Sequence, residues 1–453
     1  MIELKSVRIP DFGGSLDRPA IPAATYEQRC TRVYERAGKD WLFVYADREH
    51  NANILHLTGF DPRFEEAILL LGPRGRRVIV AGNECLSFTA ISPLPGVETR
   101  LAQSLSLMGQ DRTKAPKLAE VLAEIGIGKG QSIGIVGWKY LEPEEWTDAA
   151  PGFVLPHYMV MLLAKLIGGL DGLSDATAVL MHPEAGDRAI VDVDQLAAFE
   201  WASTRASLAV QRMVTAAQPG RSELEAAGFA GYAGEPMSCH LMFSSGNAAE
   251  TIHGLNSPRS RVLYKGDGVT AAVGYWGSLS SRAGLLDDGN NAFVKVAKGY
   301  FSGLLAWYET ADIGVTGGAL FDAVSERLGR AGLGSMLNPG HLVSYDEWSN
   351  SPVRPKSSER IRAGMPFQID VIPTPVPAGT ALNCEDTIAF ADVGLRQELA
   401  QKYPETWKRI EARRAFMRDE LGVALKESIL PFSSIPLCLA PLWLTPDRLL
   451  VNG

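Results

Sequence analysis

The sequence predicts an α/β domain followed by an α+β domain. The first third of the chain alternates short apolar runs of strand length with helical segments, which is the pattern of an α/β unit. One long helical pattern follows, over residues 194–217. Beyond it, glycine-rich turns separate strand-like runs from a further helical stretch, which indicates an α+β unit. We therefore expect one domain over residues 1–185 and a second over residues 190–453.

The first domain is expected to hold a sheet built from short apolar runs. Each run is long enough for a buried strand and too short for a helix. Before the last run, residues 113–125 carry apolar side chains at helical spacing, which predicts an amphipathic helix. The strand-like runs are residues 41–45, 68–71, 77–81 and 132–136.

The long helix at residues 194–217 opens the second domain. Asp192 or Asp194 can cap its first turn, because a carboxylate accepts hydrogen bonds from free N–H groups there. Pro219-Gly220 ends it, since proline cannot continue a helix. Later strand-like runs cover residues 269–276, 367–372 and 387–391, with a helical stretch at residues 300–333.

Charge and cysteine usage exclude several classes of protein. The 453 residues carry a formal net charge of −8 at pH 7 and include no run rich in lysine and arginine. This balance argues against a nucleic-acid partner. The five cysteines are scattered and never spaced as Cys-x-x-Cys, which favours a reducing compartment and no structural zinc.

The sequence also predicts no membrane partner. The first residues show no apolar signal segment behind a basic start. The most apolar stretch, residues 153–170, is interrupted by His157 and Lys165 and is too short to cross a bilayer. We expect a cytoplasmic protein.

The second domain contains a series of short motifs. No single motif is specific, but their order along the chain is. The series begins with the start of a helix, where the Ser222 side chain can accept a hydrogen bond from a free backbone N–H of the first turn. It continues with a turn ending at His253, a Lys-Gly-Asp-Gly run from Lys265, a Pro-Gly-His turn ending at His341, and strand segments reaching Asp370 and Glu385. In this order the motifs resemble the creatinase/prolidase/aminopeptidase-P family. Tyr26, Arg29, Asn53 and residues 57–60 resemble that family's N-terminal domain.

The resemblance implies a fold and an assembly. It implies that the second domain is a "pita-bread" α+β domain with a pocket on its curved sheet. It also implies a homodimer, in which the N-terminal domain of one subunit helps to close the site of the other. Metallopeptidases of this family hold two metal ions with two aspartates, one histidine and two further acidic residues. His341, Asp370 and Glu385 match the last three of these positions.

The chain departs from the family where the two aspartates are expected. If Arg282 aligns with the family's arginine on the same strand, the aspartate positions fall on Ala272 and Leu279. The family's second histidine falls on Trp348. A pair of ions needs bridging carboxylates to offset its charge, so we expect neither a metal pair nor another cofactor.

The creatinase subgroup of this family works without metal, and the resemblance implies that its general acid/base histidine corresponds to His253. A histidine suits this role because its pKa lies near neutral pH. Asp370 and Glu385 could equally form a structural ion pair with Arg282. The candidate catalytic residues are His253, His341 and Glu385, and the candidate substrate-binding residues are Asp370, Arg282, Trp348 and Tyr275.

The function that this reading favours is metal-independent hydrolysis of a C–N bond in a small polar or carboxylate-bearing molecule. Two alternatives stay open. One is a non-catalytic protein that binds a peptide or protein, and the other is a metal-dependent Xaa-Pro aminopeptidase or dipeptidase. Whether a single ion binds His341, Asp370 and Glu385 also stays open. The run Asp61–Glu66 receives no chemical assignment.

Overall fold

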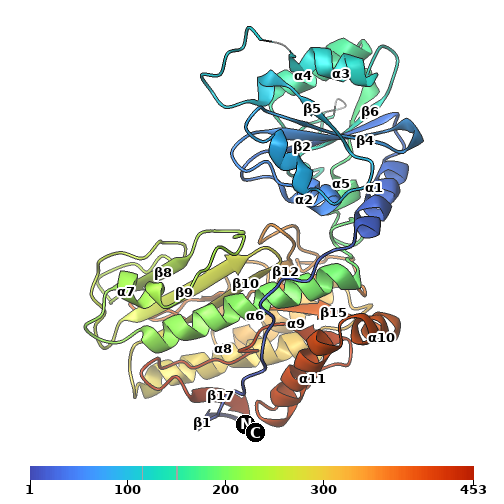
Figure 1. Cartoon of the computed structure of the whole chain (residues 1–453). Coiled ribbons are helices and arrows are strands. Elements are labelled where there is room, and N and C mark those ends of the chain that lie inside the picture. The colour runs from blue at the N-terminus through green and yellow to red at the C-terminus, as the bar shows by residue number, and fades with distance from the viewer. Residues whose placement is uncertain (115, 149–150) are drawn as a thin grey trace. The chain divides into compact units, whose positions relative to one another are not determined.

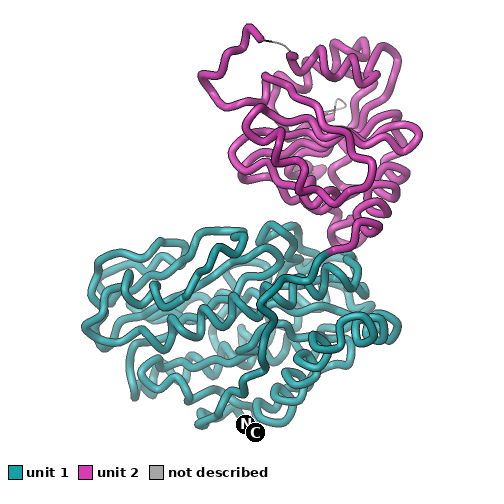
Figure 2. The backbone as a smooth tube through the Cα atoms, viewed as in Figure 1, with its two compact units in different colours: residues 1–20, 190–453 teal, residues 21–189 magenta. Residues whose placement is uncertain are grey.

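The structure, a computed structural model, describes residues 1–114, 116–148 and 151–453. The chain forms two compact units (Figure 2). The smaller unit is residues 21–189, and the larger is residues 1–20 together with 190–453. The first twenty residues thus lie outside the domain in which the sequence placed them. The reason is strand pairing, because β1 (Ile2–Ser6) pairs antiparallel with β17 (Arg448–Asn452).

A mixed sheet in the order β5-β4-β3-β2-β6-β7 forms the centre of the smaller unit. β2 and β3 are buried along their whole length, because helices cover both faces of the sheet. One hydrophobic cluster joins the sheet to α1, α2 and α5, and another joins it to α3 and α4 (Figure 1). The strands are β2 (Trp41–Ala46), β3 (Ala67–Gly72), β4 (Arg76–Ala81), β5 (Glu98–Leu101), β6 (Ile133–Val136) and β7 (Leu173–Asp175). The helices are α1 (Ala23–Ala37), α2 (Ala52–Thr58), α3 (Leu118–Ile125), α4 (His157–Ile167) and α5 (Ala178–Met181).

The predicted helix at residues 113–125 is shorter than expected. It begins at Leu118, after Lys117 in extended conformation. The Glu120 side chain accepts a hydrogen bond from the Lys117 backbone N–H at 3.0 Å, which fixes the start of the helix there.

The unassigned run Asp61–Glu66 has a structural explanation. The buried Glu65 side chain accepts hydrogen bonds from the backbone N–H groups of Cys85 at 2.9 Å and Leu107 at 3.2 Å. It thereby ties two loops together and gives the buried Cys85 N–H its acceptor.

The larger unit is built around a second sheet, in the order β12-β13-β15-β10-β9-β8, with β16 also paired to β15. All its pairings are antiparallel. The long helix α6 (Val193–Ala216) packs across β9 and β10. Its N-terminus is capped by Asp192, whose Oδ1 accepts a hydrogen bond from the Gln195 N–H at 2.9 Å. The sheet strands are β8 (Met242–Gly246), β9 (Gly268–Tyr275), β10 (Ser278–Leu285), β12 (His341–Leu342), β13 (Pro366–Ile369), β15 (Asn383–Phe390) and β16 (Ile429–Pro431).

The helical stretch expected at residues 300–333 is two helices. α8 (Asn291–Thr310) and α9 (Gly317–Arg330) are separate because Thr316 caps a new start, with its Oγ1 accepting from the Ala319 N–H. Among the described residues, no helix has the length and apolar character that a membrane span requires. The remaining elements are α7 (Glu223–Gly228), α10 (Val393–Lys402), α11 (Pro404–Asp419) and a short pair of β11 (Gly334–Ser335) with β14 (Pro373–Thr374).

Candidate functional site

Strand register places one row of side chains across the face of the larger unit's sheet. Ser281 of β10 lies opposite Glu385 of β15 on one side and opposite Ala272 of β9 on the other. Residues that are directly opposite in a ladder point to the same face, as do residues two apart along a strand. Glu385, Ala272 and Leu279 therefore share a face.

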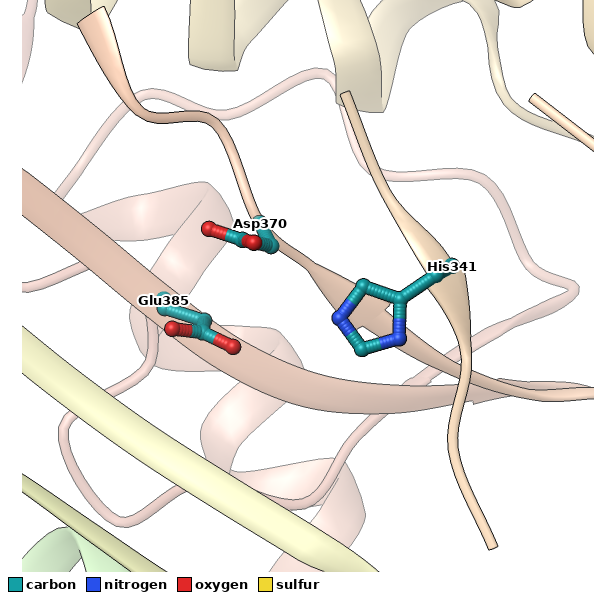
Figure 3. A group of neighbouring side chains, drawn as sticks. All are labelled: His341, Asp370 and Glu385. Atoms are coloured by element: carbon teal, nitrogen blue, oxygen red, sulfur yellow. The ribbon is translucent and has the colours of Figure 1, made fainter. Parts of the chain in front are cut away.

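The next strands add a histidine and an aspartate to that face. On β13, Gln368 lies opposite Thr387 of β15 and opposite His341 of β12, and Asp370 follows Gln368 by two residues. Figure 3 shows the side chains of His341, Asp370 and Glu385 projecting into one space. One ligand atom from each lies within 4.8 Å of the others, and all three residues are buried.

A tight turn positions His341. Gly340 has a φ of 120°, in the left-handed region that favours glycine. Trp307 of α8 donates a hydrogen bond from Nε1 to the Pro339 carbonyl at 2.7 Å, which holds the turn against the helix. A Cβ at position 340 would lie 3.1 Å from that same Nε1, so the turn needs glycine for close packing as well.

Two neighbours orient the imidazole of His341. Its Nδ1 donates to the Leu342 carbonyl at 3.2 Å, and Trp348 stacks on its ring with centroids 4.0 Å apart and an interplanar angle of 18°. Its Nε2 lies 3.0 Å from Glu347 Oε1, but outside hydrogen-bond alignment, so the contact is electrostatic. Burial alone would lower the pKa of His341, but the Glu347 and Asp370 carboxylates together with the Leu342 carbonyl outweigh burial and raise it.

Glu347 is the residue that sequence reasoning missed. It lies in the loop after β12, where the motif comparison gave it no role. A signal was present, since an acid beside the aromatic Trp348 and six positions after a buried histidine can fold back onto that histidine. Only the loop conformation shows that it does.

The two carboxyl groups are deeply buried. Among the described residues, Asp370 Oδ1 has no hydrogen-bond partner. Burial raises the pKa of Asp370 to about 6, although the charge of His341 opposes the shift. Burial, followed by the negative charges of Asp370 and Glu347, raises the pKa of Glu385 well above its usual range. The site therefore favours the protonated form of Glu385 more strongly than water does.

Glu385→Gln should make the protein more stable, by an amount that grows with pH. A carboxyl group with a raised pKa in the folded state binds its proton more tightly there than in the unfolded chain. The parent therefore loses stability as pH rises from the ordinary glutamate pKa toward the folded one, and a glutamine does not. We expect the melting temperature of the variant to exceed that of the parent by at least ~3 °C at pH 8, and by less at pH 5. Glu398→Gln, an exposed acid of the same unit, is the control. A difference in melting temperature between variant and parent that stays constant with pH would contradict the raised pKa of Glu385.

An apolar cluster takes the place of the two expected aspartates. Ala272, Leu279 and Met242 pack together, with the partly buried Cys239 against them. Ala272 and Leu279 offer no carboxylate to bridge two ions, so with the aspartate positions at these two residues the donor set does not fit a metal pair. It does fit a single divalent ion, since one ligand atom from each of His341, Asp370 and Glu385 converges there. His341 Nε2 and Asp370 Oδ1 are also buried without aligned hydrogen-bond partners.

Arg282 does not bind substrate at this site, which corrects the sequence assignment. It follows Ser281 by one residue, so its side chain projects from the opposite face of the sheet. There it pairs with Asp386, with Nη2 at 2.8 and 3.0 Å from the two carboxylate oxygens. The ion pair that was considered between Arg282 and Asp370 or Glu385 is therefore wrong. Arg282 pairs instead with Asp386, the residue that follows Glu385.

Tyr275 and His253 are also outside the group. Tyr275 lies three positions after Ala272 on β9, hence on the other face, where its ring packs near Tyr232. His253 is exposed in the loop between β8 and β9, where its backbone carbonyl accepts from the Asn256 N–H. Of the predicted site residues, the structure brings together His341, Asp370, Glu385 and Trp348.

Comparisons with known proteins show the fold. The chain matches a dipeptidase PepE from Mycobacterium ulcerans at 20% identity and a TM-score of 0.61, over 82% of this chain and 94% of that one. It matches the prolidase from Pyrococcus horikoshii at 17% identity and a TM-score of 0.63, over 81% of this chain and 95% of the prolidase. It matches a putative aminopeptidase P from Bacillus anthracis at 12% identity and a TM-score of 0.60, over 86% of this chain and 99% of that one.

No family model and no curated protein matches the sequence. The predicted fold, an α/β unit followed by a pita-bread α+β unit, is confirmed by the structural likeness.

Proposed function

We propose that this protein hydrolyses a C–N bond in a small polar molecule at the group formed by His341, Asp370 and Glu385, without a pair of metal ions. One observation carries the proposal: a buried histidine and two buried carboxyl groups converge on one sheet face, in a fold shared with solved peptidases. Carboxyl groups buried away from cations are costly, so an arrangement with no chemical use would be expensive to keep.

The geometry supports a division of roles. His341 donates from Nδ1 to a carbonyl, which leaves Nε2 as the nitrogen that exchanges a proton with substrate. Asp370 Oδ1 has no aligned partner, so it can accept a proton from the attacking water. The water oxygen bonds to the substrate carbon, the C–N bond breaks, and the leaving nitrogen takes its proton from His341 Nε2. Glu347 stabilises the charged imidazole through its 3.0 Å contact.

A second candidate is a hydrolase that uses a single metal ion, favoured because one ligand atom from each of His341, Asp370 and Glu385 lies within 4.8 Å of the others. When bound, a divalent ion there would polarise a substrate carbonyl and make a bound water more acidic. The likeness to prolidases and dipeptidases is compatible with this candidate too.

His341→Gln is expected to lower turnover of dipeptide or small amide substrates by roughly 10²–10⁴, the usual contribution of one general acid/base. His240→Gln is the matched control, since His240 is an exposed histidine of the same unit. Activity that survives a chelator supports metal-independent hydrolysis, whereas activity that is lost and returns with one manganese or zinc ion per chain supports the second candidate. Equal activity of His341→Gln and parent on a verified substrate would remove the site from the chemistry.

The homodimer and the cytoplasmic location stay predictions. Sedimentation of the purified protein tests whether it is a homodimer. The proposed hydrolysis depends neither on the dimer nor on the cytoplasmic location.

A further inference from the structure

A cavity of about 270 Å³ lies within the larger unit, on the side of the sheet away from the candidate site. It is open to solvent on one side, and three stretches of chain line it: residues 7–9 beyond β1, the last turns of α6, and the segment from Ile435 to Leu449. Figure 1 shows β1 and β17 side by side at this end of the unit. Arg282 also lines the cavity, and it projects from the face opposite to the Glu385 side chain.

Most of the cavity lining is apolar. The side chains of Val214, Ile435, Ala440, Trp443 and Leu449 line it, and each of these residues is buried. Backbone bonds fix the walls, since the N–H of Trp443 donates to the Leu285 carbonyl at 2.9 Å. An apolar cavity of ~150 Å³ accommodates benzene, so this volume suits a molecule with two fused rings.

Arg282 offers no free donor to an occupant. Its Nε donates to the Cys438 carbonyl at 2.8 Å, and its Nη1 donates to the carbonyls of Ser281 at 2.7 Å and Glu385 at 2.9 Å. Its Nη2 is taken by Asp386 and the Ile435 carbonyl. An anionic group would thus be buried here without a partner, which is unfavourable. The guanidinium plane can still pack against a flat ring.

Polar groups gather at the rim instead. Arg8, Thr215 and Asp447 are exposed residues that line the opening. Asp447 is held in place, because the Ser6 hydroxyl donates to its Oδ2. A hydroxyl or N–H at one end of an occupant would find both donors and acceptors there.

We propose that this cavity is a binding site for a small, uncharged, flat aromatic molecule with one polar end. Its ring would lie between the Trp443 and Val214 walls, and its polar end at the rim formed by Arg8, Thr215 and Asp447. The site is separate from the group on the other sheet face, so it does not depend on the proposed hydrolysis.

Binding of indole and of 2-naphthol to the full chain tests the proposal, measured by saturation-transfer NMR and titration calorimetry. We expect saturable binding of one molecule per chain. Ala440→Phe, which fills the cavity, should weaken it at least ten-fold. Ala412→Phe places the same change on an exposed position of α11 and should leave the affinity unchanged.

Thr215→Trp is a second variant, needed because Ala440→Phe alters a buried position and could lose binding by misfolding. Thr215 is exposed, so the substitution should leave the melting temperature unchanged while blocking the opening, and affinity should again fall at least ten-fold. Two results would overturn the proposal: no saturable binding of either probe by the parent, or binding that persists unchanged in both Ala440→Phe and Thr215→Trp.

Discussion

Arg282→Met should destabilise the larger unit by about 3–5 kcal/mol, the usual cost of breaking a buried ion pair. Arg282 and Asp386 are each about 4% exposed at their side chains, and their closest N–O distance is 2.8 Å. Methionine would leave the Asp386 carboxylate buried without its cation. It would also leave the carbonyls of Cys438 and Glu385 without the donor they now have.

Thermal and urea unfolding measure this loss. Arg327→Met is the matched control, because Arg327 pairs with Glu309 at a similar 3.1 Å but at the surface. Surface pairs contribute about 0–1 kcal/mol, so the control should melt close to the parent. Arg282→Met combined with Asp386→Leu should recover part of the loss, since it removes the unpaired charge. Equal losses in Arg282→Met and Arg327→Met would show that the buried pair does not stabilise the unit.

Reinstating the two missing carboxylates with Ala272→Asp and Leu279→Asp should destabilise the protein in chelator by at least ~4 kcal/mol. Leu279 is replaced in an apolar cluster, and the loss of a buried leucine side chain alone costs about 2–5 kcal/mol. Two further negative charges would then lie on the same face as Asp370 and Glu385, with His341 as the nearby cation. Added manganese should recover part of the loss, about 2.7 kcal/mol at a concentration a hundred times Kd, because the folded state alone binds it.

The double variant Ala272→Asn with Leu279→Asn isolates the effect of charge. Asparagine matches aspartate in size and polarity, so it shares the packing loss but adds no charge. We expect it to melt above the aspartate variant in chelator and to gain nothing from manganese. If the two double variants melt together in chelator, positions 272 and 279 do not face the acidic group, and the strand register is wrong.

The sequence by itself determined the two-unit fold and the three buried side chains that the structure brings together. Fold class followed from periodicity, because alternating apolar runs and a long capped helix leave few ways to bury their apolar faces. The order of the motifs selected His341, Asp370 and Glu385 through the resemblance to the family. In the structure these residues lie on β12, just after β13 and on β15 of one sheet. The loss of the two aspartates at positions 272 and 279 stays a prediction, and the structure shows that Ala272 and Leu279 share the face of Glu385.

Only the tertiary structure decided the surroundings of these residues. A strand turns successive side chains to opposite faces, so an assignment that is right to within one residue can still choose the wrong face, as it did for Arg282. Loop conformation is set by long-range contacts, which is why Glu347 reaches His341 while His253 stays exposed. The cavity behind the sheet joins residues 7–9 to residues 435–449, and no local pattern reports a space between segments so far apart in the chain. Packing creates that space, and packing is a property of the folded chain as a whole.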